Sequence, residues 1–494
     1  MAAKFGTSGL RGLATELIGE ATRRHVRAFV RYMQARRLAR RGGAVCVAYD
    51  FRDSSEAILQ DVLAALAQEG MKACVFGAVP TPTLALEAMR RKAGAIMITG
   101  SHIPADRNGL KFYVPQGEIS KRDEKAISAG VLKLKASAKP RAVTDQQVQL
   151  ETPDAFVARC RDAFSGEPLK GLRVGVYQHS TVARDMLVDL LRHAGAVVEP
   201  LGRSEIFIPV DTEAVSVATQ TLISGWCKDG RFDAIVSADG DGDRPLVCDE
   251  HGNILRGDFV GMITARFLGA KTVVTPITSN SGIDTHLSKR SLRSKVGSPY
   301  VIAGMKKAKR AGAKAIVGFE ANGGFFTLSP FKLNDATLAP LPTRDCFLPV
   351  LAVLSFAAHE KLKLSQLAAK YQLPVALAGR LENFPVATSA ALMKRLLKSP
   401  AAAKSFLAPL GVVSRIDKTD GLRCTLKDGG VVHLRPSGNA PEFRCYVEAA
   451  GPSEATQLLQ AALDLIKYSQ PQKYRAATSA AGDAADRLPA WPWP

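Results

Sequence analysis

The chain has 494 residues, of which 46% are hydrophobic and 23% charged, a composition typical of globular proteins. Its 66 Lys and Arg residues outnumber its 46 Asp and Glu residues, and the resulting net charge of +20 favours anionic partners, either small phosphates or polyanions. The longest nearly apolar stretch, residues 347–358, contains Pro349 and falls short of the roughly twenty residues that a bilayer span needs. The first residues contain no apolar run of the kind found in a secretory signal. We therefore expect no membrane partner.

The eight cysteines are scattered along the chain and form neither a Cys-x-x-Cys pair nor a Cys/His cluster with zinc spacing. Several of them, such as Cys46, Cys74 and Cys445, lie in apolar stretches that predict strands. Buried, reduced thiols are typical of proteins in reducing compartments, so we expect a cytoplasmic location.

Three segments share one order of elements, in which an apolar strand is followed by a polar turn. Their strands are expected at 44–50, 172–177 and 271–276. In the first two segments a helix follows, over 56–70 and 183–193, and ends at a glycine. We interpret them as three related α/β modules, each with a polar loop at the C-terminal end of its strand, where open α/β sheets bind ligands.

The C-terminal part of the chain has a different pattern. Strands are expected at 415–426, 431–434 and 443–449, and a helix over 453–468, which indicates a separate α+β domain. From about residue 470 onward the composition of Ala, Pro, Ser and Asp predicts a poorly ordered tail.

The strongest chemical signal is an acidic loop after the expected strand 232–236. Asp239, Asp241 and Asp243 alternate with glycines, and three carboxylates spaced in this way can converge on one hard cation such as Mg²⁺. The loop lacks the flanking helices of an EF-hand. The alternative is a solvated acidic turn, which leaves three repelling carboxylates without a counterion.

A second loop follows the apolar strand expected at 95–98. Ser101 is a candidate nucleophile or phosphate carrier, with His102 beside it and Lys111 further along the chain. A Ser-His pair in a loop is structural more often than catalytic. The acidic loop adds weight to the catalytic interpretation, because it offers a cation next to which a phosphoserine can lie.

Two further loops carry groups that recognise sugars and phosphates. Glu320 and Asn322 lie in a glycine-rich turn after strand 316–319 and could bind neighbouring sugar hydroxyls, or Asn322 could cap its own turn. The last loop joins two strands and offers a phosphate nest, with a solvated hairpin as the alternative. Its candidate phosphate-binding residues are Arg435, Ser437, Gly438, Asn439 and Arg444.

Taken together, these loops resemble those of the α-D-phosphohexomutases, of the phosphomannomutase/phosphoglucomutase kind. The resemblance covers nearly all of residues 4–468 and includes the opening segment 5–12 and the motif Pro-Thr-Pro-Thr at 80–83. It implies an isomerase that interconverts hexose 6-phosphate and hexose 1-phosphate, for mannose and also for glucose. A phosphoserine gives its phosphoryl group to the substrate, and a hexose 1,6-bisphosphate, also the activator, then turns over in the site.

The resemblance also implies a role for each candidate residue. Catalytic roles fall to Ser101, His102, Lys111, Arg11 and Arg244. The Mg²⁺ ligands would be Ser101, Asp239, Asp241 and Asp243. Glu320 and Asn322 would bind the sugar, and the nest around Arg435 would bind the phosphate that does not react.

The implied fold is α/β, with four domains around a central cleft: three related α/β modules with mixed sheets and a C-terminal α+β domain. The expected boundaries are 1–145, 146–255, 256–370 and 371–470, followed by a flexible tail over 471–494. A phosphosugar is the expected partner, no nucleic acid is expected, and the protein would be a monomer or a homodimer.

Three alternatives stay open. Departures from the usual family motifs, such as Ile103 in the serine loop, leave room for a phosphoglucosamine mutase or another phosphosugar mutase. The acidic loop alone is also compatible with a phosphatase. The arginines between residues 23 and 41 motivate a different class, a basic polyanion-binding protein with a degenerate mutase fold, although a solvated basic helix face explains them as well.

Overall fold

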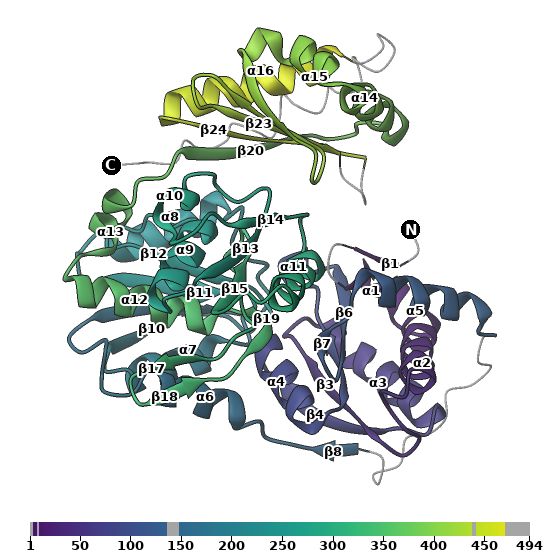
Figure 1. The fold of residues 1–494 in the computed structure, drawn as a ribbon. Coiled ribbons are helices and arrows are strands. Elements are labelled where there is room, and N and C mark those ends of the chain that lie inside the picture. The colour runs from purple at the N-terminus through teal and green to yellow at the C-terminus, as the bar shows by residue number, and fades with distance from the viewer. Residues whose placement is uncertain (1–2, 7–8, 136–147, 437–440, 470–494) are drawn as a thin grey trace. The chain divides into compact units, whose positions relative to one another are not determined.

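The computed structural model describes residues 3–6, 9–135, 148–436 and 441–469, and its contacts divide the chain into two compact units (Figure 1). The first unit comprises Met1–Thr275, Leu287–Leu292 and Gly297–Lys370. The second comprises Pro276–His286, Arg293–Val296 and Tyr371–Pro494. Within the described ranges, every helix is too short or too polar to cross a bilayer.

The first sheet of the first unit has the strand order β1-β2-β6-β5-β3-β4-β8. Its core strands β5, β3 and β4 are parallel, and β6 pairs antiparallel with β5. Alternate residues of each strand face opposite sides, so Val45 and Val47 join one apolar cluster while Cys46 and Ala48 join another. The bounds of these strands are β1 (Lys4–Phe5), β2 (Leu10–Leu13), β3 (Ala44–Tyr49), β4 (Lys72–Ala78), β5 (Gly94–Ile98), β6 (Arg107–Val114) and β8 (Val148–Leu150).

Helices cover both faces of this sheet. On one face lie α2 (Glu20–Ala35), α3 (Ser54–Gln68) and α5 (Lys121–Lys133), and on the other α4 (Thr81–Arg91). The helix expected over 56–70 is therefore α3. The segment that carries the arginines between residues 23 and 41, here called the basic segment, is helical only as far as Ala35, where α2 ends. Its last arginines follow in a turn and loop.

The second and third sheets of the first unit are also mixed. One has the order β10-β9-β11-β12, and the other contains β13-β15-β16-β19 as neighbours. The apolar stretch around Pro349 is a single helix, α12 (Phe347–Glu360), because proline is tolerated in the first turn of a helix. The remaining bounds are β9 (Arg173–His179), β10 (Val197–Arg203), β11 (Ala234–Ala238), β12 (Pro245–Cys248), β13 (Thr272–Pro276), β15 (Ile316–Phe319), β16 (Phe325–Thr327), β19 (Leu341–Asp345), α7 (Arg184–His193), α8 (Val217–Cys227) and α9 (Gly257–Phe267).

The second unit contains an antiparallel sheet of order β20-β24-β23-β22-β21 with three main helices. The single strand expected over 415–426 is two strands, because the chain turns at Gly421, whose φ is +83°. The helix expected over 453–468 is confirmed. The bounds are β20 (Val375–Leu381), β21 (Val413–Asp417), β22 (Leu422–Leu426), β23 (Val431–Pro436), β24 (Phe443–Ala449), α14 (Val386–Lys398), α15 (Pro400–Leu407) and α16 (Pro452–Tyr468).

The predicted architecture of α/β modules followed by an α+β domain is confirmed by these sheets. The predicted tail over 471–494 lies outside the described residues. The arrangement of four domains around a cleft stays a prediction.

Candidate active site

The three carboxylates of the acidic loop lie together at the C-terminal end of β11. One oxygen from each of Asp239, Asp241 and Asp243 lies within 4.8 Å of the others, and all three side chains are fully buried. The glycines between them allow the tight turn, since Gly242 adopts a φ of +66°. The sequence spacing therefore predicted this cluster correctly.

Basic side chains surround the cluster. The Nζ of Lys111, on β6, donates to Oδ2 of Asp241 and to Oδ2 of Asp243, both at 2.5 Å. The Nε of Arg344, on β19, donates to the same oxygen of Asp243 at 2.9 Å. The Nε of Arg244 lies 3.8 Å from Asp239 Oδ2. Buried carboxylates persist only when paired in this way.

The cluster does not titrate as three equal acids. Burial and the neighbouring Asp243 and Asp241 raise the pKa of Asp239 to about 7. Burial acts in the same direction on Asp243, but Arg344, Lys111 and Arg244 outweigh it and hold the pKa of Asp243 below its usual range. Near neutral pH, Asp239 is therefore the carboxylate of this pair that takes up a proton more readily.

Ser101 lies directly against this cluster, although it is far from it in the sequence. Its Oγ donates to Asp239 Oδ2 at 2.5 Å and lies 3.2 Å from His102 Nδ1. The two loops approach closely, since a Cβ on Gly240 would lie 2.8 Å from the Ser101 carbonyl oxygen. Ser101 is fully buried and has a φ of +57°, a conformation that few residues other than glycine adopt.

The other candidates near Ser101 are His102 and Arg11. Burial, Arg244 and Arg11 lower the pKa of His102 well below 6.5, which leaves its imidazole neutral at neutral pH. Desolvation, Arg244 and Arg344 lower the pKa of Arg11 to about 10. Arg11, Lys111 and Arg244 therefore supply the positive charge around the serine and the carboxylates, and His102 supplies a neutral imidazole.

Sequence reasoning missed two residues that hold this arrangement. Thr81 donates its backbone N–H to the Asp241 carbonyl at 2.9 Å and its hydroxyl to the Asp241 carboxylate. Arg344 joins the acidic loop to the glycine-rich turn of Glu320 and Asn322, here called the sugar loop, because its Nη1 donates to Glu320 Oε2 at 3.2 Å. Thr81 belongs to the Pro-Thr-Pro-Thr motif and could have been found from it. Arg344 lies in an ordinary strand, β19, and no local pattern marks it.

The sugar loop is buried beside the same arginine. Burial raises the pKa of Glu320, and Arg344 and Arg244 oppose the rise. Asn322 uses its Oδ1 to accept the N–H of Gly324 at 3.0 Å, so this side chain caps its own turn. The assignment of Asn322 as a sugar ligand stays a prediction, and it rests on the side-chain NH₂ group, which this turn does not use.

The candidate phosphate-binding arginines belong to the second unit. Arg435 on β23 and Arg444 on β24 are register partners, so their side chains leave the same face of the sheet. Arg435 donates to Asp420 Oδ2 at 3.0 Å, and Arg444 to Glu442 Oε2 at 3.3 Å. The other members of the predicted nest, Ser437, Gly438 and Asn439, lie outside the described residues.

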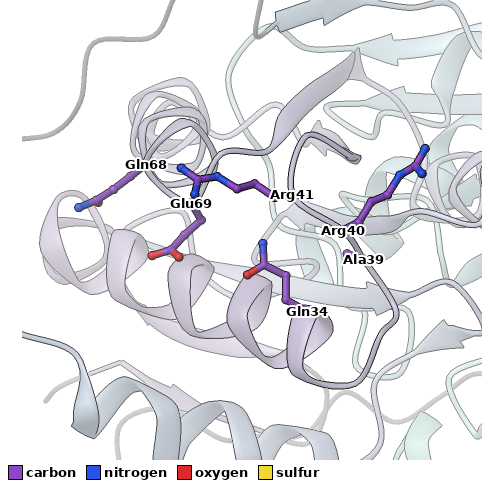
Figure 2. Close-up of a pocket in the computed structure, with 6 residues that line it drawn as sticks. All are labelled: Gln34, Ala39, Arg40, Arg41, Gln68 and Glu69. Carbon is purple, nitrogen blue, oxygen red and sulfur yellow. The ribbon is translucent and has the colours of Figure 1, made fainter.

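The first unit has a hollow of about 320 Å³ beside the basic segment (Figure 2). None of the candidate site residues lines this hollow. Its lining residues are Gln34, Ala39, Arg40, Arg41, Gln68 and Glu69. The Glu69 carboxylate already accepts from Arg27 and Arg31, each at 2.9 Å. The hollow also borders the C-terminal ends of α2 and α3, where helix carbonyls attract arginines and disfavour anions. These arginines therefore have structural contacts that do not require a polyanion.

Comparison with known proteins identifies the family of this chain. Models of phosphoglucomutase/phosphomannomutase match it in three places, as alpha/beta/alpha domain I over residues 2–138, alpha/beta/alpha domain III over 256–373 and the C-terminal domain over 381–466. A phosphomannomutase of Sinorhizobium fredii is 49% identical over 95% of this chain and 100% of its own length. The chain belongs to the phosphoglucomutase/phosphomannomutase family. The resemblance inferred from the motifs is thereby confirmed, and with it the class of enzyme, a phosphohexomutase.

Other phosphohexomutases agree with this assignment. A phosphomannomutase of Salmonella muenchen is 41% identical over 94% of this chain and 95% of its own length. The crystal structure of a phosphoglucomutase/phosphomannomutase family protein from Burkholderia thailandensis superposes with a TM-score of 0.74. It is 20% identical and covers 96% of this chain and 99% of that one, so this likeness shows the fold alone.

The acidic cluster of this phosphohexomutase fits a divalent cation. The buried Oδ1 atoms of Asp241 and Asp243 have no hydrogen-bond partner among the described residues, although each is a strong acceptor. Three carboxylates and a serine hydroxyl form the oxygen donor set that hard cations prefer. The cluster could therefore bind a metal ion.

Proposed function

We propose that this phosphohexomutase interconverts mannose 6-phosphate and mannose 1-phosphate and also accepts the corresponding glucose phosphates. The observation that carries the reaction is the buried contact between Ser101 and Asp239, which places a hydroxyl against a cluster suited to a cation. The two phosphomannomutases that match nearly the whole chain support mannose as the sugar. Glucose and mannose differ only in the orientation of the C2 hydroxyl, so a site that recognises other positions of the ring accepts both.

In the proposed mechanism, Ser101 carries the phosphoryl group. The group passes from Ser101 Oγ to a free hydroxyl of the hexose monophosphate, so the serine P–O bond breaks as the new one forms. The bisphosphate then turns over, and its other phosphoryl group returns to Ser101. We assign to His102 Nδ1, which is neutral and lies 3.2 Å from Ser101 Oγ, the proton that the hydroxyls release and regain.

The basic groups and the bound cation would counter the charge of the phosphoryl group. Mg²⁺, held by Asp239, Asp241, Asp243 and the serine phosphate, would supply electrostatic stabilisation of the transferring group when bound. Arg11, Lys111 and Arg244 add positive charge around the same atom. Preorganised charge of this kind is the main catalytic resource in phosphoryl transfer.

Substrate recognition is assigned to the two remaining loops. Glu320 would accept hydrogen bonds from sugar hydroxyls, with Asn322 beside it. The nest around Arg435, with Ser437, Gly438, Asn439 and Arg444, would hold the phosphate that does not react. The bisphosphate would be the activator, because it restores the phosphoserine.

We also propose that the chain divides into domains at 1–145, 146–255, 256–370 and 371–470 around a central cleft, with residues 471–494 as a tail. The family models support the first, third and fourth domains, because their matches fall within or close to these bounds. A monomer or a homodimer remains our expectation for the oligomeric state.

An assay of four products tests the proposal. The protein, Mg²⁺ and a trace of glucose 1,6-bisphosphate are incubated separately with mannose 1-phosphate, glucose 1-phosphate and glucosamine 1-phosphate, and the 6-phosphates and free phosphate are measured. We expect the first two to isomerise without release of phosphate. Isomerisation of glucosamine 1-phosphate alone would favour a phosphoglucosamine mutase, and release of phosphate faster than isomerisation would favour a phosphatase.

A further inference from the structure

A buried arginine lies beneath the serine loop without touching any candidate site side chain. Arg52 follows β3 in the first unit, and its side chain has no exposure to solvent. A guanidinium is costly to bury unless each of its N–H groups has an acceptor. At Arg52 every N–H has one, and four of the acceptors are carbonyl oxygens within residues 101–107.

The contacts of Arg52 gather the backbone of residues 101–107. Its Nη1 donates to the carbonyl oxygens of Pro104 at 2.6 Å and Arg107 at 2.8 Å. Its Nη2 donates to those of Ser101 at 3.0 Å and Ile103 at 2.6 Å. The Nε donates to the carboxylate of Asp50 at 3.2 Å. The planar fork of arginine is the only side chain with enough donors in fixed directions for this set.

The same network also holds the other side of the serine. Ser101 donates its backbone N–H to Thr99 Oγ1 at 2.7 Å, and the Thr99 hydroxyl donates to Asp50 at 2.6 Å. Both polar groups of the Ser101 backbone are therefore fixed by the Asp50–Arg52 pair, directly or through one hydroxyl. This matters because Ser101 has a φ of +57°, and strained backbone persists only where its surroundings determine it.

Phe207 connects the same guanidinium to the acidic loop. The Phe207 ring lies over it, with Arg52 Cζ 4.1 Å from the ring centroid. The edge of this ring would lie 3.1 Å from a Cβ on Gly240, between Asp239 and Asp241. A Cβ on Gly100 would lie 2.6 Å from Arg52 Cζ, so the serine loop sits directly on the guanidinium.

We infer that Arg52 is a positioning residue for phosphoryl transfer: its guanidinium holds the backbone of residues 101–107 so that Ser101 Oγ meets Asp239. This inference rests on the proposed function, because it assigns Ser101 the role of phosphoryl carrier. Arg52 itself touches neither the hydroxyl nor the carboxylate cluster. Its removal should therefore impair the chemical step more than substrate binding.

The test compares Arg52→Lys with a matched control, Arg24→Lys. Lysine keeps the charge beside Asp50 but cannot reach all four carbonyls. Arg24 is a partly buried arginine on α2 of the same unit. Like Arg52 it binds backbone carbonyls, since its Nη2 donates to those of Val131 and Leu134 at the C-terminal end of α5. For Arg52→Lys we expect a fall in kcat of at least about tenfold with KM within about twofold, since a misplaced reacting group costs rate rather than affinity. The control should change neither.

A second readout does not depend on activity. Amide hydrogen exchange of residues 100–107 should be faster in Arg52→Lys than in wild type, while the helices of the first unit exchange as before. Wild-type kcat and wild-type exchange in this variant would overturn the inference. An inactive wild type would overturn the proposed function instead, and the exchange data would still report on Arg52.

If Arg52→Lys does not fold, Phe207→Leu decides the matter, because it removes only the ring that covers the guanidinium. We expect this variant to lower kcat at constant KM and to speed exchange in residues 100–107. Unchanged kcat and exchange would overturn the inference, as would a loss of kcat accompanied by an equal rise in KM.

Discussion

Replacing Asp241 with Asn is expected to abolish stabilisation of the protein by Mg²⁺. Asp241 Oδ1 is buried without a hydrogen-bond partner among the described residues, while Oδ2 accepts from Lys111 and Thr81. Asparagine has nearly the same shape but removes one negative charge from the cluster. The substitution therefore tests the cation site while it leaves the packing of the loop in place.

The magnitude follows from linkage. A cation that binds only the folded state stabilises it by about 2.7 kcal/mol when its concentration is a hundred times Kd. Without metal, the variant loses one charged partner of Lys111 but also relieves repulsion with Asp239 and Asp243. The free energy of a charged hydrogen bond and that of a like-charge repulsion are of similar magnitude. Without metal, we therefore expect the free energies of unfolding of the variant and wild type to differ by no more than about 1 kcal/mol.

Urea unfolding in Mg²⁺ and in EDTA, followed by circular dichroism, measures both quantities. Asp189→Asn is the control, because Asp189 is an exposed carboxylate on α7. Wild type and the control should unfold at higher urea in Mg²⁺, and Asp241→Asn should show no such shift. Equal stabilisation in all three proteins, or none in wild type, would refute the assignment of the cluster as a cation site.

Two further outcomes follow from the packing. Gly257→Ala should lower kcat/KM by at least about tenfold, because the added Cβ would lie 2.2 Å from the Gly323 nitrogen and displace the sugar loop. The control is Gly225→Ala on α8, where the added Cβ meets open space, and it should leave stability unchanged or raise it by roughly 0.5–1 kcal/mol. Wild-type kinetics in Gly257→Ala would contradict the close approach. Burial lowers the pKa of His433 from 6.5 to about 4, so on acidification the unfolded chain takes up the proton before the folded protein does. The free energy of unfolding should therefore fall by about 2 kcal/mol between pH 7 and pH 5. Urea midpoints at both pH values should show this loss, and His433→Gln should reduce it; an equal loss in both proteins would speak against His433.

Local patterns predicted which candidate residues lie together when these residues are close in the sequence. The spacing of Asp239, Asp241 and Asp243 gave their convergence, because alternating residues of one turn cannot lie far apart. The contact between this loop and Ser101 could be expected only from the family resemblance, since 138 positions separate Ser101 from Asp239. The arginines between residues 23 and 41 do not all lie on one helix, since α2 ends at Ala35, and a run of charges does not show where a helix ends.

Residues that act through the backbone of other segments could not be found in this way. Arg52 was visible in the sequence as part of a polar turn after a strand, but its acceptors are carbonyl oxygens, which every residue carries. Arg344 likewise depends on Asp243 and Glu320, which lie on two other elements. Such roles emerge from tertiary packing and leave no spacing pattern.

Transfer of a phosphoryl group to Ser101 is the most direct test of the proposed function. Dephosphorylated protein is mixed with glucose 1,6-bisphosphate and Mg²⁺, and the gain of one phosphoryl group is followed by intact-protein mass spectrometry with peptide mapping. The control is Ser128→Ala, because Ser128 lies on α5 and its hydroxyl donates to the Glu124 carbonyl of the same helix. Wild type and this control should gain the group, with the label on Ser101. Ser101→Ala should gain none and lose mutase activity by at least about a hundredfold, or about 2.7 kcal/mol of barrier. Full mutase activity in Ser101→Ala, or a label on another residue of the wild type, would contradict the role of Ser101.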